Sequence, residues 1–380
     1  MRRKNKRKQD YREIPDIEII DLEEESISDP SMADGPTAYY IRNQKDNRLS
    51  AKRRRIWPFL LIIFLLLAAI VILLLYIHGL HSSSGHREFP SHESSGQPSQ
   101  EADPTVPILD HIVAAPAQAK GSPADDGETI IVAFGNSPLA DGRNTSSSLA
   151  KQLESLTGAT IYNCAVADSG LCAKGNVLSS SLTPLDAFHF YWLASSVCQR
   201  NNRYVYEDIF ASLGKETPSD AKDAYELLQT IDFTKVDILL LMYDAQDYLE
   251  GNLITNPQQQ EDLRAFTNHM SAGIKLFQQA YPHIRIMIMS PAYAYALDPD
   301  QEFMDSREYQ YNNATLTDYV NAQYMAAVNC EVTFIDNFNG TITSHNASTY
   351  LKDHLHLNDA GKTILAERFA AILQTDKKNE

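Results

Sequence analysis

The sequence predicts an α/β domain with a mainly parallel sheet between two helical layers, preceded by one transmembrane helix. Three observations lead to this prediction. Residues 59–77 form an uninterrupted apolar run, residues 79–127 are rich in Ser, Pro, Gly and Ala, and short apolar segments alternate with longer amphipathic ones from residue 128 onward. Strands that alternate with helices need crossover connections, which place a parallel sheet between two layers of helices.

The apolar run is long enough to cross a bilayer. It contains nineteen residues without a charge, and a helix of that length spans about 28 Å, close to the thickness of the hydrocarbon layer. We therefore expect a transmembrane helix over residues 56–78, with residues 57–78 in contact with the lipid bilayer. A cleaved signal peptide is disfavoured, because about fifty-five residues precede the run.

Charges on either side of the predicted helix indicate its orientation. Four basic residues, Lys52–Arg55, directly precede the helix, and the single Arg87 follows it. Because positive charge is retained on the cytoplasmic side, the N-terminus is predicted to be cytoplasmic and the large domain extracytoplasmic. Residues 1–55 are predicted to be a disordered tail, residues 79–127 a flexible linker, and residues 128–376 the folded domain.

The charge balance excludes one class of function. The chain has a net charge of −16 at pH 7, and residues 79–380 carry 19 Lys and Arg against 38 Asp and Glu. An acidic domain without a basic stripe is unsuited to the phosphate backbone, so no nucleic-acid partner is expected. No C-x-x-C pair occurs, and neither a metal nor a cofactor is predicted.

The order of elements follows from apolar periodicity and from turn residues. A β-branched run predicts the first strand, and the continuous run VDILLLM is typical of a strand buried on both faces. Gly158 is well placed to end the first helix. We predict strands over residues 129–134, 160–166, 236–242, 283–289 and 332–335, and helices over 146–156, 184–230 (mainly helical), 258–280, 316–328 and 360–373.

Candidate catalytic groups follow the first strand and precede the last helix. In such folds, functional groups gather at the carboxyl ends of the strands, and Ser137 stands three residues after Phe134. Asp353 and His356 are three residues apart, so they share a face in a turn or at the start of a helix. A carboxylate beside an imidazole fixes its tautomer and stabilises the imidazolium that forms when it accepts a serine proton.

The segments FGNS (134–137) and DHLHLNDAG (353–361) resemble the first and last motifs of the SGNH/GDSL hydrolase family. The resemblance extends over about residues 128–375. It implies a three-layer α/β/α fold with a flavodoxin-like sheet. It also implies that Ser137 is the nucleophile, His356 the general base and Asp353 its orienting partner.

The chain departs from the family in the motifs that bind the oxyanion. The family places an Asn in a G-x-N-D motif after the third strand, where this chain has Gln246 in the Asn position and Asp244 in the Gly position. A Gly that follows the second strand corresponds to Asp168 by simple spacing, or to Gly170 after a shift of two residues. The resemblance thus predicts an oxyanion hole formed by the backbone of Ser137 and Gly170 and by the side chain of Gln246.

Further residues near these motifs are candidates for the substrate pocket. Asn136 replaces the Asp of the family's G-D-S, and the others flank the second, third and last motifs: Asp168, Tyr243, Asp247, Tyr248 and His354. The aromatic block 188–192 is expected to fill the core. The four cysteines permit two disulfides in three pairings, or buried thiols. They are Cys164, Cys172, Cys198 and Cys330.

Together these features predict a membrane-anchored, extracytoplasmic serine ester hydrolase. Its substrate would be an acylated small molecule or a cell-surface polysaccharide. The alternative is a catalytically degenerate domain that binds glycan in the same cleft. A membrane anchor whose tail serves as a cytoplasmic adaptor is also open. Oligomeric state, acyl group and polymer do not follow from the residues.

Overall fold

The computed structural model of the chain describes residues 106–116, 127–199 and 203–379. The predicted tail, the predicted transmembrane helix and most of the predicted linker lie outside these residues. Within the described ranges, no helix has both the length and the apolar character needed to cross a membrane.

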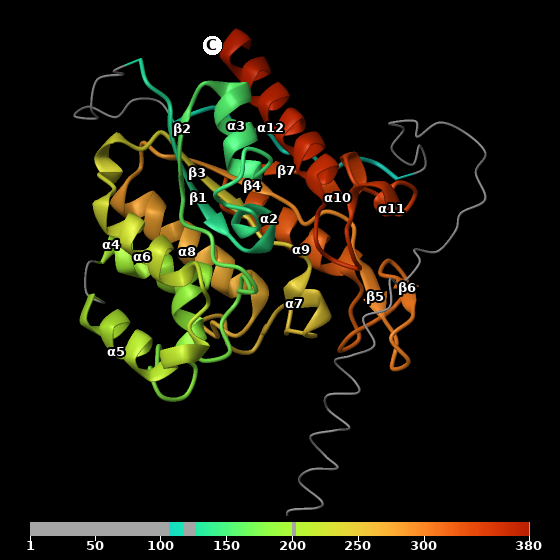
Figure 1. Cartoon of the computed structure of the whole chain (residues 1–380), viewed down its shortest axis with the longest axis horizontal. Helices are drawn as coiled ribbons and strands as arrows, with labels where there is room; N and C mark the ends of the chain where they lie inside the picture. The colour runs from blue at the N-terminus through green and yellow to red at the C-terminus, as the bar shows by residue number, and fades with distance from the viewer. Residues whose placement is uncertain (1–105, 117–126, 200–202, 380) are drawn as a thin grey trace, which may run out of the picture. The chain divides into compact units, whose positions relative to one another are not determined.

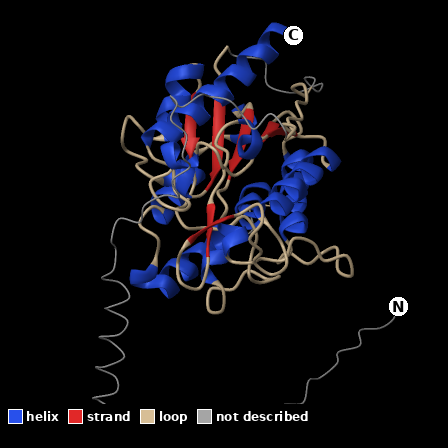
Figure 2. Ribbon diagram, turned by 90° about the vertical axis from the view of Figure 1, so that its right-hand side faces the viewer, coloured by secondary structure: helices blue, strands red, loops and turns tan. Residues whose placement is uncertain are grey.

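A five-stranded parallel sheet forms the centre of the domain (Figures 1 and 2). Its spatial order is β2-β1-β3-β4-β7. In this order β2 lies outside β1, and β4 and then β7 lie outside β3. This is the flavodoxin-like order, with its switch point between β1 and β3, and it confirms the parallel-sheet α/β part of the predicted fold class. The strands are β1 (Ile130–Gly135), β2 (Thr160–Asn163), β3 (Ile238–Met242), β4 (Arg285–Met289) and β7 (Thr333–Ile335).

Helices cover both faces of the sheet, as Figure 2 shows. On one face α3 packs against α12, and on the other α4 packs against α8, which in turn packs against α9. The bounds are α3 (Leu149–Thr157), α4 (Phe190–Cys198), α8 (Phe266–Ala280), α9 (Leu316–Asn329) and α12 (Asp359–Asn379). Two further helices, α5 (Arg203–Leu213) and α6 (Ala221–Thr230), follow α4 and build a smaller apolar cluster around Tyr206.

The core lies where the central strands meet the helices. Every residue of β3 and β4 is buried, as expected of parallel strands covered on both faces. The ring of Phe134 on β1 lies 6.0 Å from that of Phe277 on α8 and 6.4 Å from that of Phe190 on α4. Phe190 belongs to the aromatic block 188–192 that was predicted to fill the core. This is confirmed for residues 188–190, which are buried, whereas Tyr191 and Trp192 are only partly buried.

Two parts of the predicted element order need correction. Helix α8 begins at Phe266 rather than near residue 258. Asn256 and Asp262 explain the difference: their side chains accept hydrogen bonds from nearby backbone N–H groups and so stabilise turns instead of a helix. An antiparallel pair that was not predicted, β5 (Tyr295–Leu297) and β6 (Phe303–Asp305), lies between β4 and α9.

Short helices complete the carboxyl edge of the sheet. Gly158 adopts a left-handed conformation with φ of 69° and ends α3, as its position predicted. The short helices are α2 (Ser137–Ala140), α7 (Gln246–Leu249), α10 (Asn337–Gly340) and α11 (Ala347–Tyr350).

All four cysteines are free thiols, so the disulfide alternative does not apply in this structure.

Residues 106–116, which were predicted to belong to a flexible linker, lie along the outer edge of the sheet. His111 pairs with Phe334 of β7 through two backbone hydrogen bonds of 2.9 and 2.7 Å. Asp110 forms a 2.8 Å ion pair with Arg368 of α12. The folded unit therefore includes a segment that composition alone assigns to the linker.

Candidate active site

Ser137 and Asp244 emerge side by side at the carboxyl edge of the sheet. In the parallel register of β1 and β3, Gly135 is opposite Met242, and each of the two polar residues follows two positions later. A Cβ atom on Gly135 would lie 1.9 Å from the carbonyl oxygen of Met242. Only glycine permits this close approach of the two strands.

The nucleophile candidate Ser137 is the first residue of α2 and is 2% exposed. Its Oγ accepts a hydrogen bond of 3.3 Å from the backbone N–H of Asp168. Asp168 has φ of 57°, in the left-handed region that few non-glycine residues adopt. An N–H group directed at the nucleophile is in position to donate to an oxyanion formed there.

The structure therefore favours Asp168 over Gly170 as the backbone donor. A Cβ atom on Gly170 would lie 3.3 Å from Oδ1 of Asp247, so Gly170 faces that carboxylate. The prediction that named Gly170 assumed a two-residue shift, whereas the N–H directed at Ser137 Oγ is that of Asp168, the residue given by simple spacing.

Arg143 holds the loop that carries Asp168. Its guanidinium donates to the carbonyl oxygen of Asn163 at 2.6 Å and forms a 3.3 Å ion pair with Asp220. Asp220 also accepts a 3.0 Å hydrogen bond from the N–H of Ala167. Contacts on both sides of the loop can stabilise a backbone conformation that would be unfavourable in isolation.

Asp353 and His356 form the pair that their spacing predicts. Nδ1 of His356 lies 2.9 Å from Oδ2 and 3.1 Å from Oδ1 of Asp353. Oδ1 also accepts hydrogen bonds from the N–H groups of Leu355, at 2.9 Å, and His356, at 2.7 Å. The carboxylate thus orients both the ring and the turn that carries it.

These contacts shift the pKa of both partners. Burial alone would raise the pKa of Asp353, but the hydrogen bonds from the His356 ring and from two backbone N–H groups hold it well below its usual range. The Asp353 hydrogen bond raises the pKa of His356 above the ordinary value, against the opposing effect of burial. The pair is therefore arranged to stabilise an imidazolium ion.

Two lysines bind the end of the helix that begins with Ser137: Lys352 from the His356 loop and Lys362 from α12. Nζ of Lys352 lies 2.7 Å from Oδ2 of Asp141, the residue that follows α2, and Nζ of Lys362 donates to the Asp141 carbonyl oxygen at 2.9 Å. Within the described part of the chain, no hydrogen bond joins Ser137 Oγ to the His356 ring. Catalytic hydrogen bonds of this kind are often long before substrate binds.

Asn136 and Asp244 form a reciprocal pair beside the nucleophile. Nδ2 of Asn136 donates to Oδ1 of Asp244 at 2.6 Å, and the N–H of Asp244 donates to Oδ1 of Asn136 at 2.8 Å. Nδ2 also donates to the carbonyl oxygen of Ser169 at 2.8 Å. Two departures from the family motifs, Asn for Asp and Asp for Gly, are thus partners in one contact.

Asp244 is a buried carboxyl group, and only one of its two oxygens accepts hydrogen bonds from the described residues. Oδ1 accepts from Asn136 and from the N–H of Gln246, at 3.0 Å, while Oδ2 is buried and has no hydrogen-bond partner among the described residues. Burial raises the pKa of Asp244 to about 6, although the Asn136 and Gln246 hydrogen bonds and the charge of His356 oppose the shift. Asp247 adds to the increase through charge repulsion.

Gln246 does not take the oxyanion position that the motif predicts. It is the first residue of α7, and its Nε2 donates to Oε1 of Glu250 at 3.0 Å. A spacing of four residues places the two side chains on one face of the helix. The side-chain amide is therefore held along α7, and the role proposed for it from the sequence is not supported.

The other pocket candidates mainly support the structure around the site. Tyr248 is fully buried and donates to the Tyr309 carbonyl oxygen at 2.8 Å, and Tyr243 is 2% exposed. Asp247 accepts hydrogen bonds from the N–H groups that begin the 171–172 loop, at 2.6 and 3.2 Å. The ring of His354 lies 6.4 Å from that of Phe303 on β6.

Sequence reasoning did not identify the residues that position the site. Arg143, Asp141, Lys352 and Lys362 act through contacts with the loops described above. Lys352 directly precedes Asp353, which is the only sequence signal that could have drawn attention to it. Their partners are distant in sequence, so spacing could not reveal the contacts.

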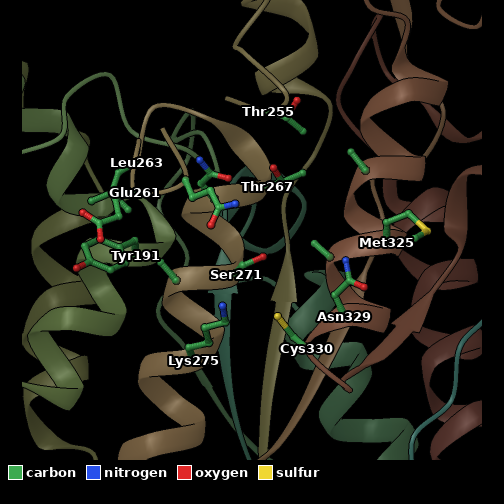
Figure 3. A pocket seen from close by; sticks show the side chains of 15 residues that line it. Tyr191, Thr255, Glu261, Leu263, Thr267, Ser271, Lys275, Met325, Asn329 and Cys330 are labelled. Carbon is green, nitrogen blue, oxygen red and sulfur yellow. The ribbon is translucent and has the colours of Figure 1, made fainter. Parts of the chain in front are cut away.

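A groove of about 920 Å³ between α8 and α9 is separate from these residues (Figure 3). Its labelled side chains include Tyr191, Lys275 and Cys330, and neither Ser137 nor the Asp353–His356 pair lines it. Across the described ranges, no three His, Cys, Asp or Glu side chains are grouped to hold a metal ion. Ser137 lies instead at the carboxyl edge of the sheet, and the Asp353–His356 loop is bonded to Asp141, the residue that follows its helix.

No family model and no curated protein matches the chain, but solved structures do. A putative lipolytic protein of the G-D-S-L family from Desulfitobacterium hafniense is 12% identical with a TM-score of 0.34, covering 64% of this chain and 99% of that one. A carbohydrate acetylesterase from Sinorhizobium meliloti is 12% identical with a TM-score of 0.37, covering 65% and 99%. A protein from Lactobacillus plantarum is 12% identical with a TM-score of 0.44, covering 65% and 97%.

The sheet order β2-β1-β3-β4-β7 is the flavodoxin-like order that the resemblance to the SGNH/GDSL family implied, and the FGNS segment lies at the carboxyl end of β1. The likeness to the solved structures concerns the fold, and the chemistry follows from the side chains of this chain.

Proposed function

We propose that the chain is a serine ester hydrolase in which Ser137, His356 and Asp353 form the catalytic triad. The observation that carries the proposal is the Asp353–His356 pair, on a loop that Lys352 attaches to Asp141, the residue after the Ser137 helix. If the D-x-x-H spacing had arisen by chance, its loop would not be expected to bind the end of the Ser137 helix.

The chemistry would proceed by acyl transfer in two halves. His356 accepts the hydroxyl proton as Ser137 Oγ bonds to the acyl carbon, and the carbonyl electron pair moves to oxygen. The N–H groups of Ser137 and Asp168 would donate to that oxygen. When the intermediate collapses, the bond to the alcohol breaks and His356 returns the proton to it. Water then releases the acyl group by the same steps.

The test is hydrolysis of p-nitrophenyl acetate by the full-length chain and by its Ser137→Ala variant. We expect turnover that the substitution reduces at least 10³-fold, because the nucleophile is lost. Ser146→Ala, which removes an exposed serine nine residues away, is the matched control and should keep full activity. Equal activity in the wild type and in Ser137→Ala would reject the proposal.

We extend the proposal to a membrane-anchored enzyme that removes acyl groups from cell-surface polysaccharide. The apolar run over residues 59–77 and the basic residues before it support this location. Two measurements test the extension: recovery of the chain in membranes after alkaline carbonate extraction, and acetate release from an O-acetylated polysaccharide. Recovery in the soluble fraction would exclude the anchored form.

A second candidate is a catalytically inactive module that binds acylated glycan. It is favoured by the side chain of Gln246, whose amide lies on Glu250 rather than beside Ser137. Such a module would bind an acetylated oligosaccharide equally well with or without Ser137, and neither protein would release acetate. Isothermal titration of both proteins together with the acetate assay separates the two functions.

A further inference from the structure

The side-chain donor for the oxyanion is unassigned once Gln246 is directed at Glu250. The backbone N–H groups of Ser137 and Asp168 remain, and removal of one donor from such a site typically costs about 10²–10³ in rate. Asp244 follows the last residue pair of the β1–β3 register by two positions, as Ser137 does. Its carboxyl group accepts a hydrogen bond from Asn136, the residue before Ser137.

The hydrogen bonds of Asp244 determine which of its oxygens can carry a proton. Oδ1 accepts from Asn136 Nδ2 at 2.6 Å and from the Gln246 N–H at 3.0 Å. A proton on Oδ1 would face these two donors, so the neutral acid must carry its proton on Oδ2. Oδ2 is buried and has no partner among the described residues, which leaves a hydroxyl without an acceptor until substrate arrives.

The charged groups around Asp244 favour the neutral form during catalysis. His356 and Asp247 are the two charged groups close enough to influence it. When His356 is neutral, as a base must be, only the repulsion from Asp247 remains. An ionised carboxylate next to a developing oxyanion would oppose the reaction, whereas a carboxylic acid at the same place would assist it.

We propose that Asp244 is a catalytic residue which, as the neutral acid, donates a hydrogen bond from Oδ2 to the oxyanion. The proton remains on Asp244 throughout. The carbonyl electron pair moves to the substrate oxygen, which accepts hydrogen bonds from Oδ2–H and from the two backbone N–H groups. His356 alone transfers protons between Ser137, the leaving alcohol and water. The proposal rests on the ester hydrolase activity proposed above.

This role makes activity depend on two protonation states at once. His356 must be neutral, so activity falls toward low pH. Asp244 must be protonated, so activity also falls toward high pH, and the profile is bell-shaped. Asp244→Asn replaces Oδ2 with an amide that donates at every pH and can keep Oδ1 as the acceptor for Asn136 and Gln246. The alkaline limb should then disappear.

The experiment measures kcat/KM for p-nitrophenyl acetate from pH 5 to 9.5 with the full-length chain. We expect a bell-shaped profile for the wild type and a plateau above the acid limb for Asp244→Asn, with at least about a tenfold gain over the wild type at pH 8.5. Asp244→Ala should have no alkaline limb and should lie about 10²-fold below Asp244→Asn throughout. Gln246→Ala is the matched control and should retain the wild-type profile.

Each other outcome gives a definite result. An alkaline limb that persists unchanged in Asp244→Asn overturns the proposal and leaves the hydrolase function intact. Loss of activity in Asp244→Asn at every pH also overturns it, provided that near-ultraviolet circular dichroism shows a native fold, because the carboxylate would then be required. A wild type that neither turns over ester nor reacts at Ser137 with a fluorophosphonate rejects both this role and the proposed function.

Discussion

The hydrogen bond between Asp353 and His356 gives a direct prediction at the level of single residues. The raised pKa of His356 means that the base is protonated, and inactive, below a pH that lies above about 6.5. We expect the acid limb of kcat/KM to report this protonation of His356. Asp353→Asn removes the main cause of the increase, so the limb should move to lower pH.

The same substitution should also reduce the plateau of kcat/KM, by about 10²–10⁴-fold, because an amide no longer stabilises the imidazolium or holds its tautomer. Asp359→Asn, an exposed acid three residues beyond His356, is the control. A pH–rate series on both variants checks the prediction. An acid limb that stays in place in Asp353→Asn would show that His356 is not the titrating base.

Because Asn136 and Asp244 bond to each other, substitutions at the two positions should have coupled effects on the free energy of unfolding. Asn136→Asp replaces a hydrogen bond by two facing carboxyl groups in a buried place, and it removes the donor to Ser169. We expect a loss of about 2–4 kcal/mol in the free energy of unfolding at pH 8. The loss should be smaller at pH 5, where one of the two carboxyl groups can be protonated.

Adding Asp244→Asn to Asn136→Asp restores one carboxylate and one amide, in exchanged positions. The double variant should recover part of the lost stability, and urea unfolding of the four proteins in a double-mutant cycle measures it. Additive losses would mean that the two side chains do not depend on each other. Ser137 is unchanged in every variant, so the cycle reports on the contact itself.

The motif residues could be predicted from sequence, and the oxyanion residues only in part. Asp353 and His356 are close in sequence, so their contact follows from spacing alone. The contacts beside Ser137 depend instead on where β3 ends and on its register with β1, which bring Asp244 rather than Gln246 against Asn136. Counting from the motif could not supply that register.

At the level of elements, His269 joins α8 to α4. Its Nε2 accepts the N–H of Tyr191 at 2.8 Å, and its Nδ1 lies 2.9 Å from the carbonyl oxygen of Leu263. The ring is therefore neutral, with its proton on Nδ1. Burial lowers the pKa of His269 to about 3.

This lowered pKa predicts a loss of stability in mild acid. The unfolded chain binds a proton at His269 below about pH 6.5 and the folded protein does not, so stability falls as the pH decreases through that value. Between pH 7 and pH 5 the contribution is about 2 kcal/mol. His269→Gln should be less stable at pH 7 and should lack this part of the pH dependence.

Urea unfolding at pH 7 and pH 5 tests the contribution, with His345→Gln as the control at an exposed histidine. Groups that titrate elsewhere are common to all three proteins, so they cancel in the difference. The same pH dependence in His269→Gln and in the wild type would contradict a neutral, buried ring in the folded state.

The strands were more predictable than the starts of helices. Continuous apolar runs such as residues 236–242 have no alternative to burial, and β3 lies within its predicted bounds. The start of α8 depends on Asn256 and Asp262, whose side chains compete with the helix for backbone N–H groups. The β5–β6 pair consists of two three-residue strands, too short for a periodic pattern to predict.

At the scale of the whole molecule, composition predicted the domain boundary poorly. The spacer composition continues to residue 127, and residues 106–116 within it nevertheless pair with β7. The contacts that retain this segment come from residues far along the chain, as in the bond from Leu109 to Asp336, 227 positions later. The transmembrane helix over residues 56–78 and the location of the domain remain predictions from the sequence.

The 106–116 segment should contribute measurably to the stability of the domain. A chain beginning at residue 118 loses the two hydrogen bonds between His111 and Phe334, the 2.9 Å bond from Leu109 to Asp336 and the Asp110–Arg368 ion pair. At about 0.5–1.5 kcal/mol for each hydrogen bond, we expect it to unfold with about 2–4 kcal/mol less free energy than a chain beginning at residue 104.

Removing the segment also exposes the edge of β7, whose backbone groups would then be free to pair with another chain. We therefore expect the shorter chain to form oligomers at concentrations where the longer one is monodisperse, or to shift its existing assembly state. Asp110→Asn in the longer chain separates the ion pair from the backbone pairing and should cost less than about 1 kcal/mol, because the pair is partly exposed. Equal unfolding free energies and equal sedimentation for the two lengths would mean that the segment lies on the domain without stabilising it.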